Sequence, residues 1–405
     1  MLADLDAEMN RREIDAIVVF GDTTLGNPDL TYVAGGNLAR GGIYFKRANH
    51  DPLLLTSSLD FHNAVNLGRV RNVCTLTDYN FEKLVVQHGR TEAYPRLMIN
   101  VLRKLGVEGK VTLAGRNDLT LGTHVVDRLR TLGVQLIGEA NPTLLEFARE
   151  TKCSDEINKI RGVAKKTAQI VNVVTEKLRN AKRKRGHLMI DGQHATVRVM
   201  KKITSVNLAL AGLIAPEGTI FTTGAASADP HNEGIASAEI KKSKLIVFDI
   251  FPQSECGYWF DLTRSFVIGR ADKKSRRMYN AVEDAQTAAL DILRQGLLGE
   301  AAMSRACDVI ERAGFKTVRE IYEGRSQQVT SGFTHSLGHG VGLTISERPN
   351  LAFQSKDPLK SGHVVTVEPG VYLQGFGGVR IEDTVKITST GNDNLGNVRK
   401  EFELT

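Results

Sequence analysis

The chain has 405 residues, of which 41% are hydrophobic and 24% charged, a composition typical of a folded protein with sizeable cores. It contains no apolar run of about 18 residues, which excludes a membrane-spanning helix, and its first dozen residues lack the pattern of a secretion signal. We therefore expect a cytoplasmic protein, with two or three domains at ~150 residues per domain. The formal net charge is +7, and residues 177–185 carry much of the excess.

The first part of the chain, residues 1–150, alternates short apolar segments with segments of helical spacing. Strands are predicted at residues 15–20, 42–45, 53–55 and 111–113, and helices at residues 81–105 and 119–132. Alternating strands and helices are typical of an α/β domain. The histidines of this part stand alone, so we expect no catalytic site in it.

The pattern changes near residues 149–154, and we place a domain boundary there, with the second domain covering residues 151–405. Ser154 is a candidate N-cap, and a long helix is predicted from it to about Arg179. The basic residues 177–185 could contact nucleic acid or an acidic partner. A solvated helix end or loop is the commoner explanation of such a run, and no aromatic side chain is interleaved for stacking on bases. We therefore expect no nucleic-acid partner.

The second part mixes strands and helices without regular alternation, which predicts an α+β domain. Strands are expected around Asp249 and Asp261. Helices are predicted at residues 273–294 and 300–313. A glycine-rich turn is predicted at residues 338–342, and the last strands at residues 364–368 and 379–388.

Four acidic residues lie inside otherwise apolar, strand-like runs of the second part: Asp249, Asp261, Glu368 and Glu382. Burying a single unpaired carboxylate costs several kcal/mol, so four of them need compensation. One interpretation is four unrelated carboxylates, each paired with a cation such as Arg264 or Arg380. The other is a metal centre, because cations neutralise the charge and use the oxygens as ligands. The recurrence in four runs, with His339 in the glycine-rich turn, favours the metal centre.

One imidazole and four carboxylates form an oxygen-rich ligand set that suits manganese, cobalt, iron or zinc. Carboxylates can bridge two ions ~3.5–4 Å apart, and a water between such ions loses a proton near neutral pH. The ions also polarise a carbonyl and stabilise the oxyanion that forms on it. The set therefore predicts two divalent metal ions, manganese or cobalt before zinc or iron, and hydrolysis of an amide.

Four segments of the second part resemble a known family. They are residues 249–265, 334–343, 367–372 and 378–384. Together they look like the motifs of the prolidase, aminopeptidase P and methionine aminopeptidase superfamily. The resemblance implies a pita-bread catalytic domain, and it extends weakly to the first part as a creatinase-type amino-terminal domain. It also implies a homodimer.

The same resemblance implies a role for each candidate site residue. Asp249 would bind one metal ion and His339 the other, while Asp261 and Glu382 would bridge both. Glu368 would be a ligand that also takes the proton of the nucleophile.

Three further residues match family positions around the metal ions. His231 would steady the substrate or the tetrahedral intermediate, and His335 would contact substrate in the proline-specific branch. Arg380 would orient the carboxylates from behind.

Two positions depart from the family pattern. Ser346 stands where the family has a histidine that hydrogen-bonds near the scissile amide, and the interval from Asp249 to Asp261 is one residue longer. Losing one such contact could lower turnover ~100-fold.

The leading hypothesis is a metal-dependent exopeptidase that cleaves the Xaa-Pro bond of dipeptides or short peptides, with proline in second position. One alternative is a weakened or inactive binding protein on the same fold, which Ser346 and the basic segment favour. Another is a creatinase-like hydrolase of a small non-peptide substrate that uses no metal, although four uncompensated acids would then repel one another.

Overall fold

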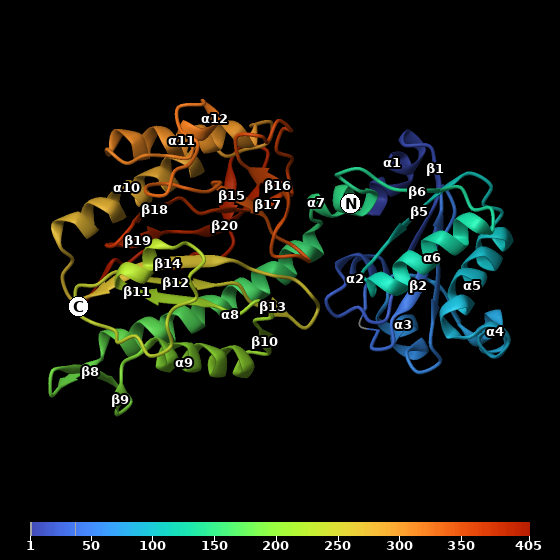
Figure 1. Cartoon of the computed structure of the whole chain (residues 1–405), viewed down its shortest axis with the longest axis horizontal. Coiled ribbons are helices and arrows are strands. Elements are labelled where there is room, and N and C mark those ends of the chain that lie inside the picture. The colour runs from blue at the N-terminus through green and yellow to red at the C-terminus, as the bar shows by residue number, and fades with distance from the viewer. Residues whose placement is uncertain (1, 37) are drawn as a thin grey trace. The chain divides into compact units, whose positions relative to one another are not determined.

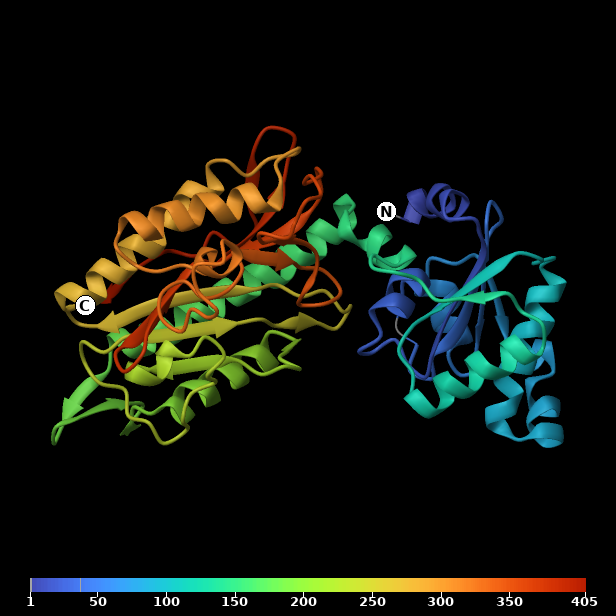
Figure 2. The ribbon, with the colours of Figure 1, turned by 45° about the horizontal axis from the view of Figure 1, so that its top comes forward.

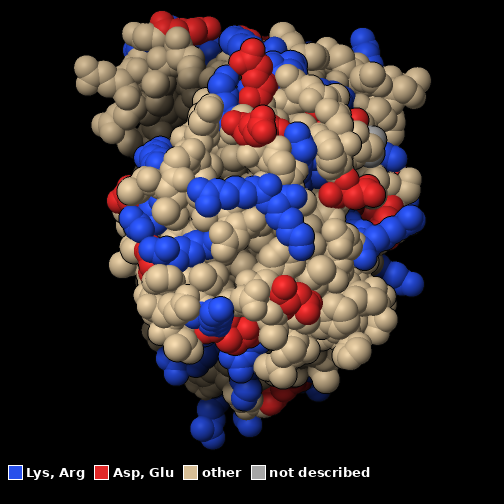
Figure 3. Space-filling view, turned by 90° about the vertical axis from the view of Figure 1, so that its right-hand side faces the viewer, with Lys and Arg blue, Asp and Glu red and all other residues tan. Residues whose placement is uncertain are grey.

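The computed structural model describes residues 2–36 and 38–405 and divides into two compact units, with the boundary between Arg149 and Glu150. Figure 1 colours the chain from blue in the first unit to red at the end of the second. In the described part of the chain, no helix combines the length and the apolar character needed to cross a membrane. On the face that Figure 3 presents, basic side chains lie among acidic ones rather than in one separate patch.

The first unit contains a six-stranded mixed sheet in the order β4-β3-β2-β1-β5-β6. Its strands are β1 (Ile14–Gly21), β2 (Gly42–Arg47), β3 (Leu53–Thr56), β4 (Asn72–Thr75), β5 (Lys110–Ala114) and β6 (Leu136–Ile137). The β1–β2 and β2–β3 pairs are antiparallel, and the remaining pairs are parallel. All four predicted strands of this part are therefore present.

Helices accompany this sheet, whose apolar core includes Val18 and Phe45 of the strands and Leu97 of one helix. They are α1 (Leu5–Arg11), α2 (Pro28–Ala34), α3 (Phe61–Leu67), α4 (Phe81–His88), α5 (Arg90–Lys104), α6 (Leu119–Thr131) and α7 (Leu144–Glu150). The prediction of one helix over residues 81–105 is wrong. Gly89 adopts a φ of +80°, outside the helical region, and separates α4 from α5.

The second unit begins with the long helix α8 (Ser154–Arg179). Its N-cap is Cys153 rather than the predicted Ser154, because the Cys153 amide donates to Glu156 Oε2 over 2.9 Å. A small three-stranded sheet follows, made of β7 (Lys182–Lys184), β8 (His187–Ile190) and β9 (Gln193–His194). The basic segment therefore ends in an exposed strand, β7. Helix α9 (Val197–Leu210) comes next.

Two larger sheets form the centre of the second unit. The four-stranded sheet contains, in order, β11 (Ile220–Thr223), β12 (Ile246–Ile250), β14 (Leu262–Ile268) and β22 (Glu403–Leu404). The five-stranded sheet contains, in order, β16 (Glu347–Leu351), β15 (Gly338–Gly340), β17 (Val364–Val367), β20 (Asp383–Ile387) and β21 (Asn392–Asn394). Strands β12, β14 and β17 are buried along their whole length, which explains their continuous apolar sequences.

Helices lie on both sides of these sheets (Figures 1 and 2). Helices α8 and α9 are on one side, and α10 (Lys273–Leu290) and α11 (Gly299–Arg312) are on the other. Two short antiparallel pairs complete the unit, β10 (Leu213–Ile214) with β13 (Gln253–Ser254) and β18 (Gly370–Leu373) with β19 (Gly377–Arg380). The helix predicted at residues 273–294 is α10, and it ends at Leu290.

The predicted glycine-rich turn at residues 338–342 contains a strand, β15. Its glycines are needed because neighbouring backbones approach closely. A Cβ at Gly338 would lie 2.0 Å from the carbonyl oxygen of Thr366, and one at Gly340 would lie 2.4 Å from that of Arg348. The strand predicted at residues 379–388 is two strands, β19 and β20. β19 pairs with β18 and β20 pairs with β17, and Ile381 and Glu382 connect the two.

Candidate metal centre

The five predicted ligands lie on or beside strands of both central sheets. Asp249 is on β12, and Asp261 directly precedes β14. His339 is on β15, Glu368 directly follows β17, and Glu382 directly precedes β20. The two sheets are joined at this point, because the Glu382 amide donates to the Thr263 carbonyl oxygen over 3.0 Å and Thr263 Oγ1 donates to Glu382 Oε2 over 2.8 Å.

The structure brings these side chains together. Asp261, His339 and Glu382 each offer a ligand atom, and those atoms all lie within 4.8 Å of one another. His339 Nε2 is 3.3 Å from Glu368 Oε1 and 3.7 Å from Asp261 Oδ2. Asp249 belongs to the same group, because its charge acts directly on Asp261. Five residues from five separate segments therefore share one small volume.

Three of the carboxylates are deeply buried, with only 7% of Asp249, 5% of Asp261 and 1% of Glu382 exposed. One oxygen of each accepts no hydrogen bond from the described residues: Asp249 Oδ1, Asp261 Oδ1 and Glu382 Oε1. Buried polar atoms are almost always satisfied, so three orphaned oxygens in one cluster need a partner. Divalent cations would supply that partner, and the donor set fits them.

The electrostatics of the cluster lead to the same conclusion. Burial raises the pKa of Asp249, and it raises the pKa values of Asp261 and Glu382 well above those of free carboxyl groups. Repulsion from the neighbouring carboxylates adds to the effect of burial. Without added positive charge, burial and mutual repulsion favour the protonated form of these carboxyls. Cations in the cluster would hold them ionised.

The interpretation as four separate ion pairs is not supported. Arg380 Nη2 lies 2.5 Å from Asp249 Oδ2, which is the only such pair within the cluster among the described residues. Arg264 instead binds Asp383, with 2.7 Å between Nη2 and Oδ1. One guanidinium therefore faces four carboxylates, and most of their negative charge has no cation from the protein.

His339 is oriented as a metal ligand would be. Its Nδ1 lies 3.1 Å from the carbonyl oxygen of Gly340, and its amide donates to Thr366 Oγ1 over 3.0 Å. A carbonyl oxygen can only accept, so Nδ1 donates to Gly340, and the other ring nitrogen, Nε2, faces the carboxylates. Such a hydrogen bond from the second nitrogen is usual for metal-binding histidines.

Arg380 links the cluster to a tyrosine and a second histidine. Its Nη1 donates to Tyr372 Oη over 3.0 Å and to the carbonyl oxygen of Pro230 over 3.1 Å. His335 Nδ1 lies 2.8 Å from the Ser336 carbonyl oxygen, so its Nε2 is free to accept the Tyr372 hydroxyl proton over 2.9 Å. A continuous chain of hydrogen bonds therefore runs from Asp249 through Arg380 and Tyr372 to His335.

Tyr372 is not among the predicted site residues. Burial raises its pKa to about 12, so it keeps its proton, and burial lowers the pKa of His335, so that imidazole is neutral. Its position in the 367–372 segment was the one signal that could have identified it.

The remaining predicted residues lie farther from the buried carboxylates. His231 is exposed. The carbonyl oxygen of its neighbour Pro230 accepts a hydrogen bond from Arg380, and the His231 ring helps to lower the pKa of His335. Ser346 is exposed, and no hydrogen bond or ion pair of the described residues ties its side chain to the cluster. Its neighbour Glu347 forms a buried ion pair with Lys152, with 2.6 Å between Oε1 and Nζ. The role of Ser346 therefore stays a prediction.

Comparison with known sequences gives relatives that carry a peptidase name. The chain is 37% identical over 185 residues to the Xaa-Pro dipeptidase of Pyrococcus furiosus, covering 45% of this chain and 48% of that protein. It is 35% identical over 185 residues to the Xaa-Pro dipeptidase of Pyrococcus horikoshii, with the same coverage. The chain thus spans about half the length of these curated relatives.

Solved structures match the fold along almost the whole chain. The Xaa-Pro dipeptidase of Bacillus anthracis superposes with a TM-score of 0.77 at 23% identity and covers 99% of this chain and 98% of its own. The X-Pro aminopeptidase of Thermotoga maritima gives a TM-score of 0.76 at 22% identity and covers 98% and 99%. The predicted fold, an α/β creatinase-type domain followed by a pita-bread domain, is confirmed.

The sequence also matches the family model described as metallopeptidase family M24 over residues 158–389, more than half of the chain. All five predicted ligands fall within that range, and membership implies a dinuclear metal site. The resemblance predicted from the motifs is therefore confirmed, and the chain belongs to metallopeptidase family M24.

Proposed function

We propose that this protein is a metal-dependent exopeptidase that hydrolyses the amino-terminal Xaa-Pro bond of dipeptides or short peptides. The observation that carries the proposal is the group of three buried, unsatisfied carboxylate oxygens beside Nε2 of His339. The relatives named as Xaa-Pro dipeptidases support the choice of substrate. We further propose manganese or cobalt as the metal.

Asp249, Asp261, His339, Glu368 and Glu382 would hold the ions. When bound, two divalent ions supply a water of lowered pKa and a Lewis acid for the substrate carbonyl. Every other part of the reaction is assigned to side chains of the chain itself.

Glu368 is the carboxylate best placed to move a proton. It is the least buried of the four, and 15% of its side chain is exposed. Thr366 Oγ1 donates to its Oε1 over 3.1 Å, which fixes the direction of the carboxylate. Glu368 would take the proton of the attacking water and pass it to the leaving nitrogen. That transfer matters for an Xaa-Pro bond, because the prolyl nitrogen carries no hydrogen and must gain one as the C–N bond breaks.

His335 and His231 would position the substrate. His335 is held in one tautomer by Ser336 and Tyr372, so its neutral ring presents a fixed surface beside the cluster. His231, on the exposed loop next to Pro230, would meet the more distant part of the substrate, including a carboxylate.

The test is release of the amino-terminal residue from a panel of Xaa-Pro dipeptides and tripeptides by the purified chain, with Xaa-Ala peptides of the same length as controls. The protein is supplied with manganese or cobalt, and metal content is measured on the same sample. We expect two ions per chain and cleavage restricted to the Xaa-Pro peptides. Bound metal without cleavage would overturn the proposed activity and favour a binding protein on this fold.

A further inference from the structure

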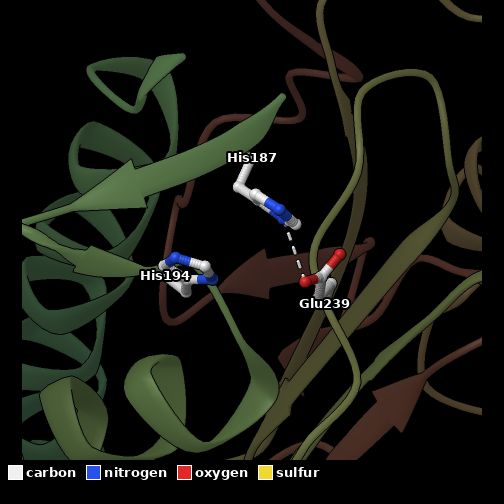
Figure 4. Close-up of side chains that lie close together, drawn as sticks. All are labelled: His187, His194 and Glu239. Atoms are coloured by element: carbon white, nitrogen blue, oxygen red, sulfur yellow. Dashed lines mark ion pairs between the residues drawn. The ribbon is translucent and has the colours of Figure 1, made fainter. Parts of the chain in front are cut away.

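A second group of potential metal ligands lies outside the centre described above. His187 on β8, His194 at the end of β9 and Glu239 each offer a ligand atom, and these atoms all lie within 4.8 Å of one another. Figure 4 shows the three side chains pointing toward a common space, from the small β7–β8–β9 sheet and from a neighbouring loop. None of them is used by the proposed peptidase mechanism.

The distances suit one small ion. His187 Nδ1 lies 3.0 Å from Glu239 Oε1. Two ligands that bind the same ion at about 2.0–2.2 Å, at adjacent coordination positions, are separated by roughly 3 Å. The nitrogen and oxygen are therefore already spaced as two ligands of one ion would be.

His194 needs one small adjustment. Its ring stacks on that of His187, with 4.6 Å between centroids and 24° between planes, and an ion cannot lie in two nearly parallel ring planes at once. His194 is exposed, and its terminal torsion is broad, so its ring can rotate toward the ion at little cost.

Backbone pairing fixes the three positions relative to one another. The Ile240 amide donates to the Ala195 carbonyl oxygen over 2.9 Å, and the Val197 amide donates to that of Ala238 over 3.0 Å. Glu239 is thus held beside residues 195–197, directly after His194. The site is largely formed before any ion arrives, which reduces the ordering that binding requires.

The surroundings select among metal ions. The three ligands border a cavity of about 250 Å³, which Arg183, Lys241 and Lys242 also line. Hard ions such as Mg²⁺ and Ca²⁺ depend on several carboxylate or carbonyl oxygens, and this group offers a single carboxylate. Two imidazoles and one carboxylate instead suit Zn²⁺, in the manner of sites with three protein ligands and one open position.

We propose that His187, His194 and Glu239 form a zinc site that fastens the β7–β8–β9 sheet to the segment around Glu239. The open coordination position faces the cavity, where Arg183, Lys241 and Lys242 favour a small anion as the fourth ligand.

The test is equilibrium dialysis of the full chain against micromolar Zn²⁺ in the presence of excess Mg²⁺, with metal content measured per chain. The unaltered chain should bind one zinc equivalent more than His187→Ala/His194→Ala. Glu239→Gln should keep the fold and weaken this extra zinc by at least ~10-fold. The matched control is His62→Ala/His88→Ala, which removes two exposed histidines of the first unit and should lose no zinc.

Trypsin provides an independent readout, because the sheet carries basic cleavage sites at residues 182–185. Zinc should slow cleavage there several-fold in the unaltered chain and in the control, but not in the double variant. Equal zinc content in the unaltered chain and in His187→Ala/His194→Ala, or equal protection from trypsin, would overturn the proposal. Because the comparison counts only the difference between variants, it holds whether or not the chain is an active peptidase.

Discussion

Arg380 and Asp249 form a buried ion pair, with 2.5 Å between Nη2 and Oδ2, on the edge of the carboxylate cluster. Only 3% of Arg380 and 7% of Asp249 are exposed. The pair leaves Asp249 Oδ1 without a hydrogen bond, so one oxygen is oriented by the guanidinium and the other is available to a metal ion. The same guanidinium also holds Tyr372 and the carbonyl oxygen of Pro230, and it therefore sets the geometry of several parts of the site.

Replacing Arg380 should weaken metal binding. We expect Arg380→Ala to lower metal affinity ~10- to 100-fold, as loss of a residue that orients a ligand usually does. Arg380→Lys should restore little, because an ammonium cannot reproduce the directional bonds of the guanidinium, which include one from Nε to Thr263 Oγ1 over 3.0 Å. Metal titration followed by peptidase assay checks this, with the exposed Arg312→Ala as control. Full metal affinity in Arg380→Ala would contradict the assigned role.

Tyr372→Phe tests the link between Arg380 and His335. Removing the hydroxyl deprives His335 Nε2 of its donor and Arg380 of an acceptor, without touching a metal ligand. We expect kcat to fall about tenfold, the equivalent of roughly one hydrogen bond, with metal content unchanged. Since burial raises the pKa of Tyr372 to about 12, the rate of the unaltered chain should show no titration of this group in the range from pH 6 to about 10. A loss of metal in Tyr372→Phe would argue that the hydroxyl supports the ligands instead.

Glu150 should make the free energy of unfolding depend on pH in the acidic range. Burial opposes its ionisation, but the hydrogen bond from Lys360 and the nearby His363 ring outweigh burial and lower its pKa to about 2 from 4.5. A lowered folded-state pKa stabilises the protein above the unfolded value, and that stabilisation is lost as the pH falls from about 4.5 to about 2. We expect Glu150→Gln to remove about 2 kcal/mol of the pH-dependent part of the free energy of unfolding. Urea unfolding at a series of pH values measures it, and parallel curves for both proteins would be inconsistent with the assignment.

The buried pair of Lys152 and Glu347 should be sensitive to single changes. Only 1% and 6% of their side chains are exposed, and Thr344 Oγ1 also donates to Glu347. Glu347→Leu alone should destabilise the second unit by about 3 kcal/mol, because it leaves a buried ammonium unpaired. Lys152→Met combined with Glu347→Leu should recover most of that loss. A double-mutant cycle by urea unfolding checks the coupling, and purely additive effects would show that the two side chains act independently.

Much of the site could be predicted because its signal is local. Each of the four carboxylates lies in an apolar, strand-like run of the sequence, either within a strand or directly beside one, and that pattern is visible without tertiary structure. The role of Tyr372 could not be predicted, because its partner His335 lies 37 residues away and the bond depends on how β15, β17 and β18 are placed. The glycines at 338 and 340 look like a turn in sequence, yet they serve close strand pairing, which only the neighbouring backbones reveal.

Smaller errors have equally physical causes. Ser154 looks like an N-cap, but the side chain of Glu156 reaches back to the amide of Cys153 and moves the cap by one residue. Residues 379–388 carry apolar side chains at intervals along their whole length, as one strand would, but Glu382 donates its amide to Thr263 on the other sheet, and this interrupts the ladder. The absence of any bond from Ser346 to the cluster could not be inferred from the motif alone.

The most direct measurement is the rate of Xaa-Pro hydrolysis by Glu368→Ala in saturating manganese, relative to the unaltered chain, with circular dichroism to confirm the fold. Glu368 is both a proposed ligand and the proposed proton carrier, so we expect a loss of ~100- to 10,000-fold with the fold intact. An unchanged rate in the folded variant would contradict the account of this centre as the peptidase site.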